Sequence, residues 1–336
     1  MTASLLDAGE AQRRQSQSAR AQLQQYGTAI DWPWPGLTEK LGPLQKGTIH
    51  FLCSPPGNGK TTMAGSLILE WLAHGITIIS GWFERDPGSA RRYLAAMSLG
   101  LNPGDVLGGE WERRDDFKSQ LHAMDDRVAE MEAGVAPWNQ LHLIEHDHVS
   151  LRAIREMGDM AVALSDRQTI CMVDHIDHLG PDGAVGFGAS SNAVYAIHAH
   201  AKAHDTRWLN FSQMNNREMS RGGTMLPRHR ALAFAAVSNG QTKEQCGWTM
   251  GGIYRPLRPN CPVEDIKAVT NDQKALSEVL WPGITCVNVM KHRDHGERVG
   301  ERAILGWERG RIIDTPDNVK IELQAQQHGI PLGSGF

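Results

Sequence analysis

The stretch Phe51-Leu-Cys-Ser-Pro-Pro-Gly-Asn-Gly-Lys-Thr-Thr62 decides the fold of this chain. Residues 48–53 predict a short apolar strand, residues 61–71 predict a helix, and a turn rich in proline and glycine joins the two. In such a unit the N–H groups of the loop and of the helix N-terminus point at one spot, where the helix dipole favours an anion. The sequence therefore predicts a loop that binds phosphate groups.

The residue types of this loop suit that chemistry. Gly57 and Gly59 let the backbone approach a phosphate closely. Lys60 supplies a positive charge for the β- and γ-phosphates of a nucleotide, and the Thr61 hydroxyl can bind Mg²⁺. Ser54 departs from the full pattern, because a glycine is usual at that position. We expect nucleotide contacts along the whole loop, at Ser54, Pro55, Pro56, Gly57, Asn58, Gly59, Lys60, Thr61 and Thr62.

Length and composition limit the class of protein. The chain has 336 residues, 40% of them apolar, which is enough for one large α/β domain or two small ones. Its formal net charge of −4 argues against a broadly basic nucleic-acid coat, so any such contact should be confined to local loops. The five cysteines form no CxxC pair, which favours buried free thiols in a reducing compartment. Without an apolar run of membrane length or a signal sequence, a cytosolic location is expected, that of the host if phage-encoded.

Strands alternate with helices along most of the chain. After the phosphate loop, apolar strands are predicted at residues 76–80, 141–144, 169–174, 207–212 and 250–254. Such alternation indicates parallel strands joined by helical crossovers. Two later strands, residues 284–290 and 303–307, flank a charged turn at residues 292–300 and predict a C-terminal hairpin at a sheet edge. We therefore predict an α/β fold with a mostly parallel central sheet.

Polar side chains follow several of the predicted strands. Glu84 follows the second strand, Asp174 ends the strand at residues 169–174, and Gln213 follows the strand at residues 207–212. In an open parallel sheet, ligands bind at the carboxyl ends of the strands. Asp174 could hold Mg²⁺, Glu84 could orient and deprotonate an attacking water, and Gln213 could sense the γ-phosphate.

With these residues in place, the chain resembles the RecA-like P-loop ATPase domain of DnaB-type replicative helicases, including phage helicases. The resemblance covers roughly residues 28–314. It lies in the order of several motifs, which are Ile30-Asp-Trp-Pro-Trp-Pro-Gly-Leu-Thr-Glu-Lys-Leu41, the phosphate loop, Trp82-Phe-Glu-Arg85, Met172-Val-Asp174, Phe211-Ser-Gln-Met214, Thr242-Lys-Glu-Gln245, Ile253-Tyr-Arg-Pro256 and Val289-Met-Lys-His-Arg293.

The resemblance implies a function and a set of roles. It implies ATP-driven 5′→3′ translocation on single-stranded DNA, with unwinding of duplex by a homo-hexameric ring. Glu84 would be the catalytic base, and Lys60 and Gln213 would contact the phosphates. Lys291 and Arg293 would reach a neighbouring subunit's nucleotide. ATP and Mg²⁺ would be the cofactors, and candidate partners are primase, polymerase or a helicase loader, with no membrane.

The chain also departs from the family pattern. We expect no separate N-terminal collar domain, because residues 1–27 resemble only the linker helix that docks on the adjacent subunit. Ala235-Ala-Val-Ser238 stands where the family often has Asp-Leu-Arg-Glu in its DNA loop, and Cys246 replaces a usual aspartate. DNA contacts would then fall on other groups, namely Arg217, Arg221, Gly222, Gly223, Arg228 and Arg230.

We accordingly expect a docking helix at residues 1–27, an ATPase domain at residues 28–314 and a polar tail at residues 315–336. Two other functions stay open. One is a RecA/RadA-like recombinase that forms filaments. The other is a nucleotide-dependent DNA clamp or partner-loading protein, for which a catalytic glutamate and arginine finger would be superfluous.

Overall fold

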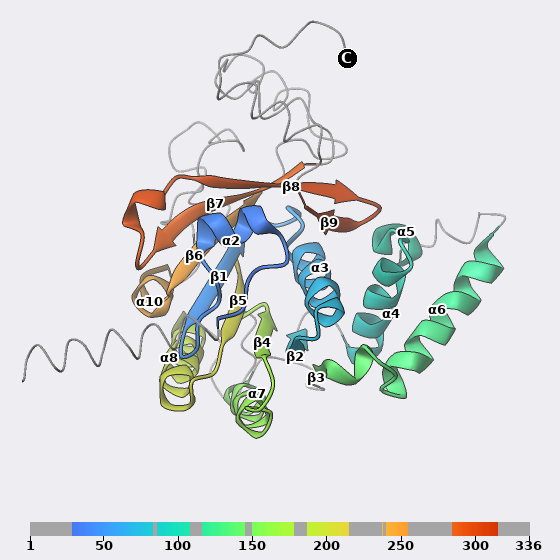
Figure 1. Ribbon diagram of the computed structural model, residues 1–336, viewed down its shortest axis with the longest axis horizontal. Helices are drawn as coiled ribbons and strands as arrows, with labels where there is room; N and C mark the ends of the chain where they lie inside the picture. Colours follow the sequence, from blue (N-terminus) through green and yellow to red (C-terminus); the bar gives the residue numbers. More distant parts are fainter. Residues whose placement is uncertain are drawn as a thin grey trace, which may run out of the picture.

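A computed structural model describes residues 29–82, 86–107, 116–144, 150–177, 187–214, 237, 240–254 and 284–314. These residues form one nine-stranded sheet with helices on both faces (Figure 1). The predicted docking helix at residues 1–27 and the predicted tail at residues 315–336 lie outside the described residues. Among the described helices, none is long and apolar enough to cross a membrane.

The strand order of the sheet is β3-β2-β4-β5-β1-β6-β7-β8-β9. Every pairing from β3 to β6 is parallel, and every pairing from β6 to β9 is antiparallel. The strands are β1 Ile49–Ser54, β2 Thr77–Trp82, β3 Leu141–Leu143, β4 Thr169–Asp174, β5 Trp208–Gln213, β6 Thr249–Tyr254, β7 Ile284–His292, β8 Arg302–Glu308 and β9 Arg311–Ile313. The predicted α/β class with a mostly parallel sheet and a C-terminal hairpin is therefore confirmed.

The helices connect these strands. The described α-helices are α2 Pro35–Leu41, α3 Lys60–Ala73, α4 Pro87–Ser98, α5 Pro103–Leu107, α6 Phe117–Glu132, α7 Leu151–Ala163, α8 Phe187–His204 and α10 Gly240–Cys246. Short 3₁₀ turns lie at Trp138–Gln140 and Gly296–Arg298. Figure 1 shows α6 extending away from the sheet beyond α4, and Met124 is its one buried residue.

Two apolar layers hold the helices on the sheet. Successive side chains of a strand point to opposite faces. Leu52 of β1 accordingly joins the layer that contains α2, α3 and α4. Ile49, Phe51 and Cys53 of the same strand join the layer formed with α7 and α8. Because β1 is buried on both faces, its sequence is apolar throughout most of its length, as expected for a central parallel strand.

The structure corrects three details of the sequence prediction. β7 continues to His292 instead of ending at residue 290, because Lys291 and His292 still pair with Met250 and Thr249 of β6. The hairpin is not at the sheet edge, since β9, which was not predicted, adds one more strand beyond β8. The predicted strand at residues 76–80 is displaced to residues 77–82.

Candidate nucleotide-binding site

The phosphate loop has the backbone that its glycines predict. Gly57 and Gly59 have φ values of 71° and 88°, a region that residues with a side chain rarely adopt. Ser54, by contrast, is the last residue of β1, pairs with Gln213 of β5 and has no positive φ. A glycine is therefore not required at that position, which explains how the departure from the usual pattern is tolerated.

The helix that follows the loop presents an open N-terminus. Gly59 caps α3, and no side chain caps its first turn. The first N–H groups of an α-helix have no carbonyl partner one turn earlier, and they carry its partial positive charge. A phosphate group bound here would satisfy them.

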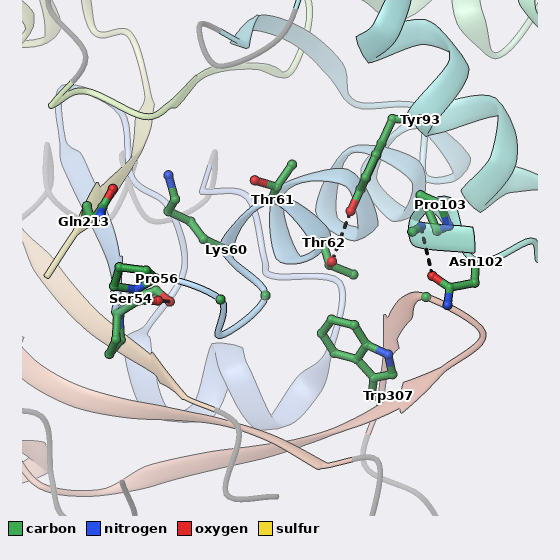
Figure 2. Close-up of a pocket in the computed structure, with 15 residues that line it drawn as sticks. Ser54, Pro56, Lys60, Thr61, Thr62, Tyr93, Asn102, Pro103, Gln213 and Trp307 are labelled. Carbon is green, nitrogen blue, oxygen red and sulfur yellow. Dashed lines mark hydrogen bonds between the residues drawn. The ribbon is translucent and has the colours of Figure 1, made fainter. Parts of the chain in front are cut away.

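A pocket of about 590 Å³ lies at this helix N-terminus. Figure 2 shows Lys60 and Gln213 on one side of the pocket, Thr61 and Thr62 in the middle, and Tyr93 and Trp307 on the other side. Most of the predicted loop lines the pocket, as do several residues from α4, α5 and the β8–β9 turn. The lining residues are Ser54, Pro55, Pro56, Gly57, Gly59, Lys60, Thr61, Thr62, Tyr93, Asn102, Pro103, Gly104, Gln213, Trp307 and Gly310.

Asn58 is the one loop residue of the prediction that does not line the pocket. It is 2% exposed, and its side-chain amide donates to the carbonyl oxygens of Pro55 and Pro56 at 3.4 and 3.3 Å. These bonds run from the tip of the loop back to its start. Asn58 therefore shapes the loop from within instead of facing a ligand.

Lys60 and Asp174 form an ion pair across the base of the site. The Lys60 Nζ atom lies 3.0 Å from Asp174 Oδ1, and the two side chains are 11% and 3% exposed. The pair joins the start of α3 to the end of β4, as the shared strand-end edge predicts. A carboxylate this buried needs a cation beside it. Lys60 provides one here, and Mg²⁺ could provide one beside a bound nucleotide.

That fit supports the predicted metal site. Hard cations such as Mg²⁺ take oxygen ligands, and the Thr61 hydroxyl and the Asp174 carboxylate are of that kind. Thr61 lines the pocket. Asp174 does not line it, but it lies directly behind Lys60, with which it forms the ion pair. With a metal ion held there, Lys60 would be released to contact the phosphates.

The far side of the pocket was not predicted. The Tyr93 hydroxyl lies 3.1 Å from Thr62 Oγ1, which fixes α4 against the start of α3. Trp307 at the end of β8 and Asn102 before α5 complete this side (Figure 2). Aromatic and amide groups of this kind suit the base of a nucleotide, while the loop suits its phosphates.

Lys291 and Arg293 lie together at the C-terminal end of α10. The Lys291 Nζ atom donates to the carbonyl oxygens of Glu244 and Gly247, and Arg293 Nη2 donates to the Gln245 carbonyl oxygen at 2.9 Å. Cations at a helix C-terminus are favoured by the helix dipole. Burial lowers the pKa of Lys291, and the charge of Arg293 lowers it further.

Lys291 lies in β7 and Arg293 follows its last residue, and both side chains reach carbonyl groups at the end of α10, on one face of the sheet. His292 points to the other face, where its ring lies against Gly42. A Cβ atom added to Gly42 would lie only 3.1 Å from the Nε2 atom of His292. Arg293 also lies over the Trp248 ring, with its guanidinium carbon 5.4 Å from the ring centroid. That cation–π contact adds to the carbonyl bonds in fixing the guanidinium.

The two cations are distant from the phosphate loop of their own chain. The Arg293 N–H donates to the Trp248 carbonyl oxygen, and the Trp248 N–H donates to that of Ile49, the first residue of β1. The phosphate loop follows Ser54, at the opposite end of β1. Five residues of strand span about 17 Å. The backbone of Arg293 therefore lies at the opposite end of the parallel strands from its own phosphate loop.

Several predicted residues lie outside the described residues. They include the predicted base, Glu84, and all the predicted DNA contacts, Arg217, Arg221, Gly222, Gly223, Arg228 and Arg230. Asp86, an acidic residue close to Glu84 in sequence, caps α4, where its carboxylate accepts the Ser89 N–H at 2.9 Å. Hydrogen bonds from Ser89 lower the pKa of Asp86, so this carboxylate is committed to the helix start.

Comparisons with known proteins agree with this architecture. No protein-family model matches the sequence, and a search of curated proteins finds no relative. Among solved structures, the chain is similar to a DnaB-like replicative helicase described with its interactions with primase. That match has a TM-score of 0.64 and 14% sequence identity, and it covers 85% of this chain and 62% of that one.

A second similar structure is described as an ATPase domain, with a TM-score of 0.59 and 14% identity over 81% of this chain and 86% of that one. At this level of identity the likeness establishes the fold. The described residues therefore have the RecA-like fold of the ATPase domains of DnaB-type replicative helicases, with the predicted phosphate loop at the end of its first strand.

Proposed function

We propose that this chain is the ATP-hydrolysing motor of a DnaB-type replicative helicase. In this proposal it assembles as a homo-hexameric ring, translocates 5′→3′ on single-stranded DNA and separates duplex. One observation carries the proposal. Lys60 and Gln213 line the pocket at one end of the parallel strands, where Asp174 pairs with Lys60. Lys291 and Arg293 lie at the opposite end, where they would suit a neighbour's nucleotide.

The chemistry follows from this division. The loop N–H groups and Lys60 would hold the β- and γ-phosphates, with Mg²⁺ bound by Thr61 and Asp174. Mg²⁺ would neutralise charge that develops on the phosphates. Glu84 would accept a proton from the attacking water, and the Gln213 amide would contact the γ-phosphate. Arg293 presents a planar fork suited to phosphate oxygens.

Supplied by the next subunit, Lys291 and Arg293 would complete each site only in the assembled ring. A finger of this kind can accelerate phosphoryl transfer by roughly a thousandfold or more. Loss of the γ-phosphate would then change which neighbours are held together. Movement of DNA would fall to the region of Arg217, Arg221, Arg228 and Arg230, and residues 1–27 would dock each subunit on the next. Primase, polymerase or a loader would be the partners of a cytoplasmic complex.

A forked DNA substrate tests the whole proposal. The protein should separate a fork that carries a 5′ single-stranded tail when ATP and Mg²⁺ are present, and the Lys60→Ala variant should not. Electron micrographs of the protein with single-stranded DNA and an ATP analogue should show closed rings. Filaments would support the recombinase alternative, and DNA-stimulated hydrolysis without strand separation would support the clamp.

A further inference from the structure

We propose that Asp177 and Lys243 are positioning residues whose buried ion pair fixes Gln213 at the nucleotide pocket and links it to α10, the helix that holds Lys291 and Arg293. This inference rests on the proposed function, because it assigns a purpose to the position of groups that act on ATP. It adds two residues that the motifs of the phosphate loop, the metal and the fingers do not include.

Asp177 gathers three donors on one carboxylate. It accepts hydrogen bonds from the Ser212 hydroxyl at 2.8 Å, from the backbone N–H of Gln213 at 2.8 Å and from the Lys243 ammonium at 2.6 Å. Ser212 in turn accepts a bond from Lys243 at 2.6 Å. The last two residues of β5 are therefore fixed at the point where the strand reaches the pocket.

Lys243 is fully buried, with an exposed side-chain fraction of 0%. A buried ammonium is costly unless it is paired and hydrogen-bonded, and Asp177 and Ser212 supply those partners. Burial alone would raise the pKa of Asp177, but the Lys243 charge, the His175 ring 3.6 Å away and hydrogen bonds from Lys243 and Gln213 hold that pKa well below its usual range. The Asp177 carboxylate is therefore charged at neutral pH, and neither partner can move away without leaving the other buried and unpaired.

The same helix holds the two cations at its other end. Lys243 lies within α10, and the carbonyl oxygens that hold Lys291 and Arg293 belong to the next residues, Glu244, Gln245 and Gly247. Because Lys243 and these carbonyl groups lie within about one helical turn of each other, we expect a displacement of Lys243 to move them as well. A shift of Gln213 would act on Asp177, then on Lys243, and then on the carbonyl groups that orient the fingers.

This arrangement gives α10 two contacts of different kinds. Through Lys243 and Asp177, α10 is connected to Gln213, which lines the chain's own pocket. Through the carbonyl groups at its C-terminal end, it holds the two cations that the proposed function assigns to a neighbour's site. The ion pair is therefore placed to keep the pocket and the two cations of one subunit at a fixed distance from each other.

The first experiment separates positioning from stability. Asp177→Asn and Lys243→Met each leave one buried charge unpaired, so each variant should melt at a lower temperature. The double variant removes both charges and should regain most of that stability. Its kcat for ATP should nevertheless stay reduced by roughly tenfold or more, while its KM for ATP stays within about threefold of the parent value. Parental kcat in the stable double variant would overturn the proposal.

A matched control and a second measurement protect this test. The Lys40→Met/Glu301→Gln double variant removes another ion pair, 3.1 Å long and remote from the pocket, and should keep the parental kcat.

Hydrogen exchange of a peptide that contains Gln213 gives a readout even if the Asp177 variants are less stable. Its amide should exchange faster in both variants that lack the Asp177 carboxylate, and unchanged exchange would overturn the proposed restraint.

The second experiment tests the link to the fingers. Lys60→Ala subunits can donate Lys291 and Arg293 to Arg293→Ala subunits, whose own phosphate loops are intact. Two mixtures are compared, in which the Lys60→Ala subunit either is otherwise parental or also carries Asp177→Asn and Lys243→Met. The second mixture should regain less activity, although the pocket of the Lys60→Ala subunit is inactive in both. Equal restoration would overturn the link through α10. Failure of the proposed function itself is recognised separately, by parental hydrolysis in Lys60→Ala alone.

Discussion

Replacing Asp174 by asparagine should tighten ATP binding in the absence of metal while abolishing the benefit of Mg²⁺. The reason is the ion pair between Lys60 and Asp174, in which 3.0 Å separate the two charged groups. Without a metal ion, this carboxylate competes with the phosphates for Lys60 and also repels them. The asparagine side chain would retain a polar group of similar shape but would remove the negative charge.

The size of the effect follows from the geometry. At a separation of 3.0 Å and an effective dielectric constant of about 20, the attraction between two charges is at most about 5.5 kcal/mol. Solvent and the remaining amide contact offset much of it, so a net gain of about 1.4–2.8 kcal/mol is expected, or roughly ten- to a hundredfold in metal-free affinity. Hydrolysis with Mg²⁺ should fall by about a hundredfold or more, because one oxygen ligand of the metal lacks its charge.

Titration of a fluorescent ATP analogue, with a chelator and again with Mg²⁺, measures both effects. A double-mutant cycle with Lys60→Met provides the control, since the gain from Asp174→Asn should be much smaller when Lys60 is absent. If metal-free affinity is unchanged or weaker in Asp174→Asn, the ion pair does not compete with nucleotide and the reasoning fails.

Three further predictions concern other parts of the chain. Glu84→Gln should bind ATP yet hydrolyse it about 10²–10⁴-fold more slowly in a steady-state assay, and parental turnover would show that another group is the base. Replacing Arg228 and Arg230 by Gln should lower the slope of log affinity for single-stranded DNA against log salt by about 1.4, and an unaltered slope would place the phosphate contacts elsewhere. Burial, with a smaller contribution from His292, lowers the pKa of His50 from 6.5 to about 3, so its neutral form contributes stability that is complete above pH 6.5 and is lost as pH falls towards 3. Urea unfolding of His50→Gln between pH 6.5 and 5 should therefore show a slope shallower by up to about 1.4 kcal/mol per pH unit, and parallel curves for the two proteins would contradict this assignment.

The site residues that could be predicted from sequence are those set by local pattern or by strand order. The glycines of the phosphate loop indicate its turn, and Asp174 and Gln213 follow apolar strands whose carboxyl ends must meet in a parallel sheet. The two-residue spacing of Lys291 and Arg293 likewise predicted that they lie on one face, where both contact the end of α10. These inferences required only the local sequence pattern and the rule that the carboxyl ends of parallel strands lie together.

The missed residues depend on contacts between distant segments. Nothing near Lys243 indicates that it is buried, because its partner Asp177 lies 66 positions away in the chain. Trp307 reaches the pocket only because the antiparallel strands β7, β8 and β9 return across the sheet. The length of β7 was underestimated for a related reason, since Lys291 and His292 are polar yet pair with Met250 and Thr249.

Subunit mixing tests the central claim most directly, because it asks whether two halves of one active site come from different chains. Lys60→Ala and Arg293→Ala should each be inactive alone in ATP hydrolysis, and Arg293→Ala should still bind nucleotide. Mixed, they should regain part of the parental activity, at interfaces that pair an intact phosphate loop with an intact finger. Full activity of Arg293→Ala alone, or no recovery at any ratio once subunit exchange has been verified, would contradict a site completed between neighbours.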